Sequence, residues 1–217
     1  MGFVIAVDGP AASGKGTIAA RLGALYGLPV LDSGLLYRAI GLAVVDGGGD
    51  LDDEADCARA ARILDPTSLE GARFRTRAAG EAASRVAVHP AVRQTLIEFQ
   101  RAFARREPGA VIDGRDIGTV IVPDAPAKLY VTASQTARAT RRWRQLSGLG
   151  EATDFAAILA DVQKRDARDA ARAAAPMRPA DDAVLLDTTD LDIDSAFDAA
   201  RRIVEDARAR WEQSPKG

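Results

Sequence analysis

The chain has 217 residues, with 29 Lys and Arg against 31 Asp and Glu, and a net charge of −2. A chain of this length buries ~70% of the surface that its unfolded form exposes, enough for one core and an insert. The charge balance excludes a general attraction to nucleic acid or to anionic membranes, so phosphate recognition must be local. Cys57 is the only cysteine, which excludes an intrachain disulfide and fits a reducing compartment. The apolar N-terminal segment is too short for a signal peptide or a membrane span, so we expect a cytoplasmic protein.

A glycine-rich segment lies between the first predicted strand and helix. Residues 3–7 predict a buried strand, and residues 18–26 have the spacing of a helix that begins near Lys15. Glycines let backbone N–H groups face a polyphosphate, the helix N-terminus adds positive charge, and a lysine there reaches the β- and γ-phosphates. The alternative is a glycine-rich turn with a chance lysine. We predict a nucleoside triphosphate site at Gly9, Pro10, Ala11, Ala12, Ser13, Gly14, Lys15, Gly16 and Thr17.

The rest of the chain alternates strands and helices. Strands are predicted at 28–31, 110–112, 127–131 and 184–186. Helices are predicted at 35–45, 52–64, 81–88, 91–106, 134–146, 154–174 and 195–211, with an irregular connection at 65–80 and a frayed tail at 214–217. This alternation predicts an α/β fold with a parallel sheet that is covered on both faces. The helical stretch at about 52–106 is too long for one crossover between strands. We therefore expect it to form an insert over the carboxyl edge of the sheet, where ligands bind.

Polar motifs follow the second strand and interrupt the later helices. Asp32-Ser33-Gly34, with Tyr37 and Arg38, is either a binding motif or a helix N-cap at Asp32 or Ser33. Ser84 and Arg93 flank a break between two helices, and in isolation they are a small helix residue and a surface cation. Arginine is the ordinary cation of this chain, which has only four lysines, so position within a motif decides its meaning.

Asp113-Gly114-Arg115-Asp116-Ile117-Gly118-Thr119 directly follows a predicted buried strand. The motif places two carboxylates and a guanidinium at the strand end, beside glycines that permit close backbone approach. A plain turn would use Asp-Gly without needing Arg115 and Asp116, so we favour a functional motif. Asp113 is placed where a strand-end carboxylate can hold a metal ion through a water molecule.

The helix before the last strand carries Arg165, Arg168 and Arg172, spaced i, i+3 and i+7 along one face. The alternative is a solvated helix in which Arg165 pairs with Asp161 and Asp169, each pair worth ~0.3–0.5 kcal/mol. The helix follows a glycine-rich break, as a mobile lid would, which favours a functional role.

Together these motifs resemble the bacterial cytidylate kinases, a family of P-loop nucleoside monophosphate kinases, over essentially the whole chain and in the same order. The resemblance implies one nucleoside monophosphate kinase domain of the P-loop NTPase fold, three-layer α/β/α with a parallel five-stranded sheet. The core would comprise about 1–50, 107–146 and 175–217, the insert that binds the monophosphate about 51–106, and a short helical lid about 147–174.

The resemblance further implies transfer of the γ-phosphate of ATP to CMP or dCMP with Mg²⁺, by a monomer whose partners are these nucleotides and neither nucleic acid nor a membrane. The implied catalytic residues are Lys15, Arg115, Arg165 and Arg172. Ser33, Arg93 and Asp116 would contact cytosine; Ser84, Arg165 and Asp169 the ribose; Arg38, Arg115 and Arg172 the acceptor phosphate. Thr17 would ligate the metal, together with Asp113 through water.

The chain departs from the family pattern in places. Residues 65–80 are shorter than the sheet-containing insert of the family, and Ala170 stands where some members have another arginine. Gly16 replaces the hydroxyl residue that follows the lysine of the commoner P-loop, which weakens the expectation that Thr17 ligates the metal directly.

Other functions stay open at this point. A P-loop kinase of another acceptor, such as a different monophosphate or shikimate, would not need the Ser33, Arg93 and Asp116 grouping. A nucleotide-switched protein of the GTPase type would need Asn-Lys-x-Asp, which surrounds none of the lysines. A protein that binds ATP without catalysis would not need the second cluster of polar residues. The single histidine, His89, is expected to be structural.

Overall fold

The computed structural model describes residues 2–66, 69, 71–172 and 175–213. Within them five parallel strands form one sheet in the order β2-β3-β1-β4-β5. The strands are β1 (Phe3–Asp8), β2 (Val30–Asp32), β3 (Gly109–Gly114), β4 (Ala127–Thr132) and β5 (Val184–Asp187). The predicted α/β class and five-stranded parallel sheet are confirmed.

Helices connect these strands and cover the sheet. They are α1 (Lys15–Tyr26), α2 (Ser33–Asp46), α3 (Glu54–Arg62), α4 (Arg77–Val86), α5 (Pro90–Ala104), α6 (Gln135–Gly148), α7 (Phe155–Ala170) and α8 (Ile193–Gln213). Two short turns complete them, the 3₁₀ turn η1 (Ala72–Arg75) and the π-helical turn η2 (Ile117–Ile121). Among the described residues, every helix is too short or too polar to cross a lipid bilayer.

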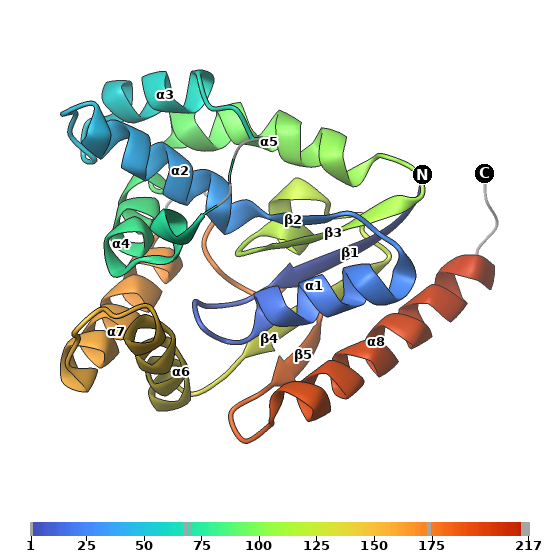
Figure 1. Ribbon diagram of the computed structural model, residues 1–217. Coiled ribbons are helices and arrows are strands. Elements are labelled where there is room, and N and C mark those ends of the chain that lie inside the picture. The colour runs from blue at the N-terminus through green and yellow to red at the C-terminus, as the bar shows by residue number, and fades with distance from the viewer. Residues whose placement is uncertain (1, 67–68, 70, 173–174, 214–217) are drawn as a thin grey trace.

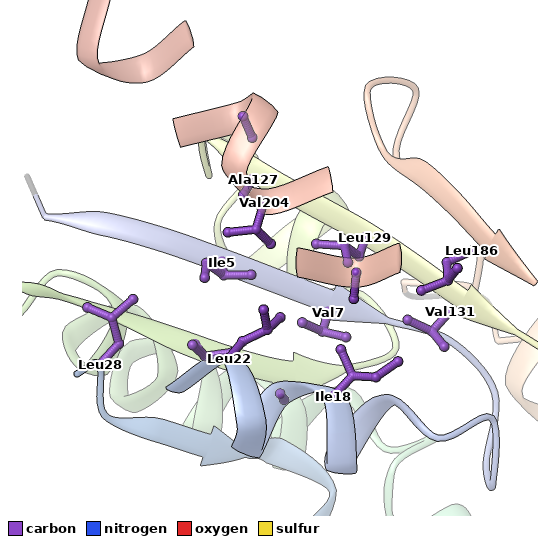
Figure 2. Packing of buried hydrophobic residues seen from close by; sticks show 14 of the residues in the cluster. Ile5, Val7, Ile18, Leu22, Leu28, Ala127, Leu129, Val131, Leu186 and Val204 are labelled. Carbon is purple, nitrogen blue, oxygen red and sulfur yellow. The ribbon is translucent and has the colours of Figure 1, made fainter. Parts of the chain in front are cut away.

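The central strand β1 is apolar on both faces because both faces are covered. Alternate side chains of a strand point to opposite faces. Ile5 and Val7 pack against α1 and α8, with Leu22 and Val204 among the residues that fill this layer (Figure 2). The opposite face packs against α5 and η2. Figure 1 shows α1 and α8 together on one side of the sheet, which gives the three layers expected of this class.

The helices α2 to α5 share a second apolar core. It is built from Ile40 of α2, Cys57 of α3, Val86 of α4 and Val92 of α5, among others. A Cβ at Gly41 would lie 2.7 Å from the Cβ of Ala82, so only glycine lets α2 and α4 pack this closely. The predicted insert therefore rests on α2.

The connection predicted as irregular at 65–80 contains more structure than expected. It includes η1, and α4 begins at Arg77 rather than at 81 because the hydroxyl of Thr76 caps the amide of Ala79. Residues 67, 68 and 70 of this stretch lie outside the described part of the chain. In 51–66, 69 and 71–106 the structure has helices and turns but no strand.

The helix predicted at 154–174 is too long at its C-terminal end. The structure ends α7 at Ala170, with Ala171 as its C-cap, so Arg172 lies beyond the helix. The chain turns back after this end, because the amide of Met177 donates to the carbonyl oxygen of Asp169 at 3.0 Å. Residues 173–174 and the predicted tail at 214–217 lie outside the described residues.

The sheet brings strand-end carboxylates to one edge. In the parallel registers Asp32 is paired with Asp113, and Asp8 with Gly114. The arrowheads of β1 and β3 point towards the helices α2, α4, α6 and α7 (Figure 1). Those helices therefore stand around the carboxyl edge, the position where α/β folds bind ligands.

Candidate active site

The loop between β1 and α1 has the backbone that its glycines allow. Gly14 has a φ of 93° and serves as the N-cap of α1, and Ala12 has a φ of 60°. Gly9 has a φ of 145°, and a Cβ there would lie 2.0 Å from the carbonyl oxygen of Val131. Side chains would be excluded at this position by strain and by collision. We refer to residues 9–17 as the phosphate loop.

Donors from distant segments hold the carbonyl groups of the phosphate loop. Arg138 of α6 donates to the carbonyl oxygen of Ala11 at 3.3 Å. The hydroxyl of Thr188 and the guanidinium of Arg141 donate to the carbonyl oxygen of Ser13 at 2.8 Å and 3.3 Å. The loop conformation is thus fixed by α6 and by the segment after β5, neither of which sequence reasoning assigned to the site.

Lys15, at the start of α1, faces the carboxyl edge of the sheet. Its Nζ lies 3.2 Å from Oδ2 of Asp113, and both side chains are largely buried. Burial raises the pKa of Asp113, although the charge of Lys15 opposes the shift. Burial also lowers the pKa of Lys15, and Arg115 adds to the effect. A phosphate oxygen near this ammonium would add negative charge and so favour its charged form.

A cluster of charged side chains lies beside the phosphate loop, where Arg165 lines a cavity together with Ala11 and Ala12. Asp169 of α7 is 1% exposed and accepts from Nε of Arg115 at 3.0 Å. It also accepts from Arg172, while Nε of Arg165 lies 4.0 Å away. Although burial opposes ionisation, Arg115 and Arg172 hold the pKa of Asp169 below its usual range. We call Arg115, Arg165, Asp169 and Arg172 the guanidinium cluster.

The guanidinium cluster contains more positive than negative charge. The buried Nε atoms of Arg165 and Arg172 find no hydrogen-bond partner within the described residues. Burial and, to a smaller extent, the charge of the neighbouring Arg115 lower the pKa of Arg165 to about 9. A buried donor without a partner destabilises a protein by ~1–3 kcal/mol. Both observations indicate that the cluster is completed by an anion.

A second group of predicted residues adjoins the guanidinium cluster. Arg93 of α5 forms a buried ion pair with Asp116 and donates to the hydroxyl of Tyr37 at 3.4 Å. The hydroxyl of Ser33 donates to the carbonyl oxygen of Asp113 at 2.8 Å. These residues and the three arginines of the guanidinium cluster border one small cavity of about 30 Å³, which is lined by Ser33, Gly34, Tyr37, Ala83, Ala87, Arg93, Gly114, Arg115, Asp116, Arg165 and Arg172.

The remaining predicted residues lie near this cavity without lining it. Arg38 of α2 is partly exposed, with its guanidinium 3.5 Å from Asp32. Ser84 of α4 is buried, and its hydroxyl has no partner among the residues that the structure places. Thr17 is exposed in the first turn of α1. The structure therefore assembles most of the predicted acceptor residues and leaves Thr17 separate from them.

The structure decides between the two interpretations of the motif after β2. Asp32 is the N-cap of α2, because its carboxylate accepts from the amide of Leu35 at 3.2 Å. Ser33 lies within the helix and turns its hydroxyl toward β3. Asp32 is therefore a helix cap, whereas Ser33 does not cap the helix and is placed where it could contact a ligand.

The arginines of α7 do not share one environment. Arg165 borders the cavity, whereas Arg168 donates to the carboxylate of Glu81 on α4 at 2.9 Å. Asp161 pairs with Arg77 of α4, so the alternative of a solvated helix lacks its pair of Asp161 with Arg165. The three arginines do not form the expected common face, because Arg172 lies beyond the end of the helix and Arg168 is paired with α4.

The site also depends on Asp8, which sequence reasoning did not identify. Asp8 is the last residue of β1 and is buried, and it accepts from the amides of Ile117 at 2.8 Å and Gly118 at 2.7 Å. The position of Asp8 could have indicated its role from the sequence, because a carboxylate at the end of this strand lies at the edge of the sheet where ligands bind.

The donor set was also tested for a metal ion. Within residues 2–66, 69, 71–172 and 175–213, no cluster of three or more His, Cys, Asp or Glu could hold one. Magnesium bound with a nucleotide needs only one or two protein ligands besides phosphate and water. A Cβ placed on Gly16 would lie 3.9 Å from Oδ2 of Asp113, so this carboxylate faces the first turn of α1. The residues present therefore fit a magnesium ion that is shared with a phosphate.

Comparison with known proteins identifies the family of the chain. A family model described as cytidylate kinase matches residues 5–206. A cytidylate kinase of Caulobacter vibrioides is 68% identical over 97% of this chain and 99% of its own length, and one of Caulobacter sp. strain K31 is 64% identical over the full length of both. The crystal structure of an uncharacterized protein from Eubacterium ventriosum, 16% identical, matches the fold with a TM-score of 0.51 over 94% of this chain and 98% of its own. The chain belongs to the cytidylate kinase family.

Proposed function

We propose that the protein transfers the γ-phosphate of ATP to CMP or dCMP, giving ADP and CDP or dCDP by in-line transfer. The observation that carries this proposal is the pair of anion-binding groups at one sheet edge. Lys15 and the phosphate loop would hold the donor, and the guanidinium cluster, with its unpartnered Nε atoms in the described structure, would hold the acceptor.

The acceptor needs no general base. The second pKa of a phosphate monoester is ~6, so its oxygen is mostly deprotonated at neutral pH. The reaction then depends on alignment of the two phosphates and on neutralisation of the transferred group. The planar guanidiniums of Arg115 and Arg172 bind phosphate oxygens in pairs, and Arg38 adds positive charge at the rim. His89 is not required, and its Nε2 lies 2.9 Å from the carbonyl oxygen of Leu51.

Asp116 would select the base. Cytosine carries an exocyclic amine where uracil has a carbonyl oxygen, and a carboxylate accepts from the first and repels the second. Arg93 fixes Asp116 through a buried ion pair, and Ser33 borders the same cavity. Ser84, Arg165 and Asp169 would face the ribose, and nothing in their chemistry excludes a deoxyribose.

Magnesium would be held by Thr17 and, through water, by Asp113. When bound, the ion would neutralise negative charge on the phosphates of ATP. The protein contributes the carboxylate and the hydroxyl near the loop, while Lys15 adds its own charge.

We further propose that residues 51–106 and 147–174 close over the nucleotides as insert and lid. Arg77 of α4 donates to Asp161 of α7 at 2.9 Å, and Glu81 accepts from Arg168. These contacts join the two segments beside a second cavity, which Ala11, Ala12 and Arg165 also line. Closure would keep water from the γ-phosphate, which prevents hydrolysis of ATP.

A coupled assay with ATP and each of CMP, dCMP, UMP, AMP and shikimate tests the proposal. We expect ADP formation with CMP and dCMP, slower reaction with UMP, and none without an acceptor. Preference for AMP or shikimate would contradict the acceptor assignment. Hydrolysis that is independent of every acceptor would indicate a nucleotide-binding protein rather than a kinase.

A further inference from the structure

The turn η2 lacks a cap of its own. Asp116 stands at its N-cap position, yet in the described structure its carboxylate makes no capping hydrogen bond and pairs with Arg93 instead. The first amides of any helical turn have no partner inside the turn and need acceptors from elsewhere. Here the acceptor comes from another strand.

Asp8 supplies the missing cap from the end of β1. Its Oδ1 accepts from the amide of Ile117 at 2.8 Å and its Oδ2 from that of Gly118 at 2.7 Å. The carboxylate is 4% exposed, so water cannot readily replace either hydrogen bond. Ile117 and Gly118 directly follow Asp116. Because Asp8 accepts from their amides, the carboxylate of Asp116 is not needed as a cap and can face the cavity.

The side chain of Asp8 is independent of the contacts that hold the phosphate loop. Ala11 and Ser13 are held by Arg138, Arg141 and Thr188. Within the part of the chain that the structure describes, the Asp8 carboxylate forms hydrogen bonds only with η2. A change confined to this carboxylate should therefore disturb the segment of Arg115 and Asp116 and spare the donor site.

We propose that Asp8 is a positioning residue for recognition of the acceptor base, acting by capping η2 so that Asp116 faces the cavity. The inference rests on the proposed CMP kinase function and deepens it. Asp8 touches neither nucleotide in this scheme; it acts through the two amides. Burial raises the pKa of Asp8 to about 7, although the amides of Gly118 and Ile117 oppose the shift, so both hydrogen bonds are complete only when the carboxyl is ionised.

The series Asp8→Asn and Asp8→Ala tests the proposal. Asparagine keeps the shape but presents one NH₂ group to an amide donor, so one hydrogen bond is lost; alanine loses both. We expect the KM for CMP to rise about tenfold in Asp8→Asn, which corresponds to one hydrogen bond, and further in Asp8→Ala. The KM for ATP should stay unchanged, and the preference for CMP over UMP should fall. If Asp8→Ala does not fold, Asp8→Asn decides.

Asp182→Asn is the matched control. Asp182 accepts from Nζ of Lys128 at 2.8 Å, and the Lys128 side chain flanks Gly118, so the control removes a carboxylate whose partner packs against the same turn. It should leave both KM values unchanged.

Equal rises in the KM for ATP and CMP in Asp8→Asn, or no change in either, would overturn the inference. Loss of thermal stability with unchanged selectivity would also overturn it, because that outcome describes a purely structural residue. A wild-type enzyme that does not phosphorylate CMP would remove the proposed function itself, and this result is read before any variant is compared.

Discussion

The phosphate loop and the guanidinium cluster are both built to bind anions, but they are assembled in different ways. The phosphate loop is one run of nine residues whose main chain takes conformations such as the φ of 93° at Gly14. The guanidinium cluster joins α7 with residues beyond β3, and charged side chains rather than main chain form it. A site made of backbone can be encoded locally, whereas a site made of side chains depends on the whole fold.

The two regions also differ in their balance of charge without ligand, although each contains buried polar atoms that lack a partner among the described residues, the hydroxyl of Ser13 in the phosphate loop included. Lys15 has a partner in Asp113. The cluster gathers Arg115, Arg165 and Arg172 around Asp169, and it leaves Nε atoms unsatisfied in the described residues. We therefore expect binding of the acceptor to stabilise the folded protein, because its phosphate supplies the negative charge that the cluster lacks.

The largest expected effect tests the cluster. Arg172→Ala should lower kcat by about 10³-fold, the lower end of the effect of an arginine on phosphoryl transfer. The melting temperature should change little, because Asp169 keeps Arg115 as a partner and one repulsive cation is removed. Initial rates and thermal unfolding of the variant check both statements. A large loss of stability would instead make Arg172 a structural residue.

The next effect separates base recognition from phosphate binding. Asp116→Asn should lower kcat/KM for CMP about 10- to 100-fold, since a hydrogen bond to a charged partner contributes ~1.5–3 kcal/mol, and should leave the KM for ATP unchanged. Asparagine is preferred to alanine because removal of the side chain would leave Arg93 buried and unpaired, which costs ~3–5 kcal/mol.

Asp124→Asn, an exposed position on the same connection, is the control for this variant. Equal turnover of CMP by Asp116→Asn and the wild type would contradict the assignment of Asp116 to the base.

A third prediction concerns pH and Asp8, which precedes the phosphate loop and caps η2. Its pKa is raised from 3.8 to about 7 by burial, so between these values the folded state holds a proton that the unfolded state has lost. The contribution of Asp8 to stability is therefore present below pH ~4 and is lost as the pH rises through ~7, by at most ~1.4 kcal/mol per pH unit.

Urea unfolding at several pH values checks this prediction, with Asp8→Asn as the comparison in which the slope due to Asp8 is absent. Titration of the other groups is common to both proteins and cancels in the difference. Parallel stability curves for the two proteins would contradict the raised pKa.

The smallest effect tests the contacts between insert and lid. Asp161→Asn removes the ion pair with Arg77, whose side chains are 42% and 44% exposed. Exposed pairs contribute ~0.2–1 kcal/mol, so we expect a slight fall in melting temperature that high salt abolishes. Glu205→Gln, which removes a pair with Arg201 within α8, is the control remote from the cavity. A large loss of activity in Asp161→Asn would indicate that this pair does more than join the segments.

Most of the architecture was predictable because its signals are local. The five strands and the helices around the phosphate loop follow from apolar runs and helical spacing. The errors lie at helix ends: α4 begins earlier because Thr76 caps it, and α7 ends earlier, at Ala170. The turn η2 was not predicted, because the carboxylate that caps it lies 109 positions away in the chain.

The sequence by itself determined the phosphate loop and the parallel α/β order, since glycine conformations and strand–helix alternation are properties of neighbouring residues. Only the tertiary structure decided which charges meet. In the folded protein Asp169 pairs with Arg115 and Arg172. Arg168 pairs with Glu81, and Asp8 caps η2. The reason is physical: a buried charge must find its partner in space, and several residues of equal chemistry compete for that place until packing selects one.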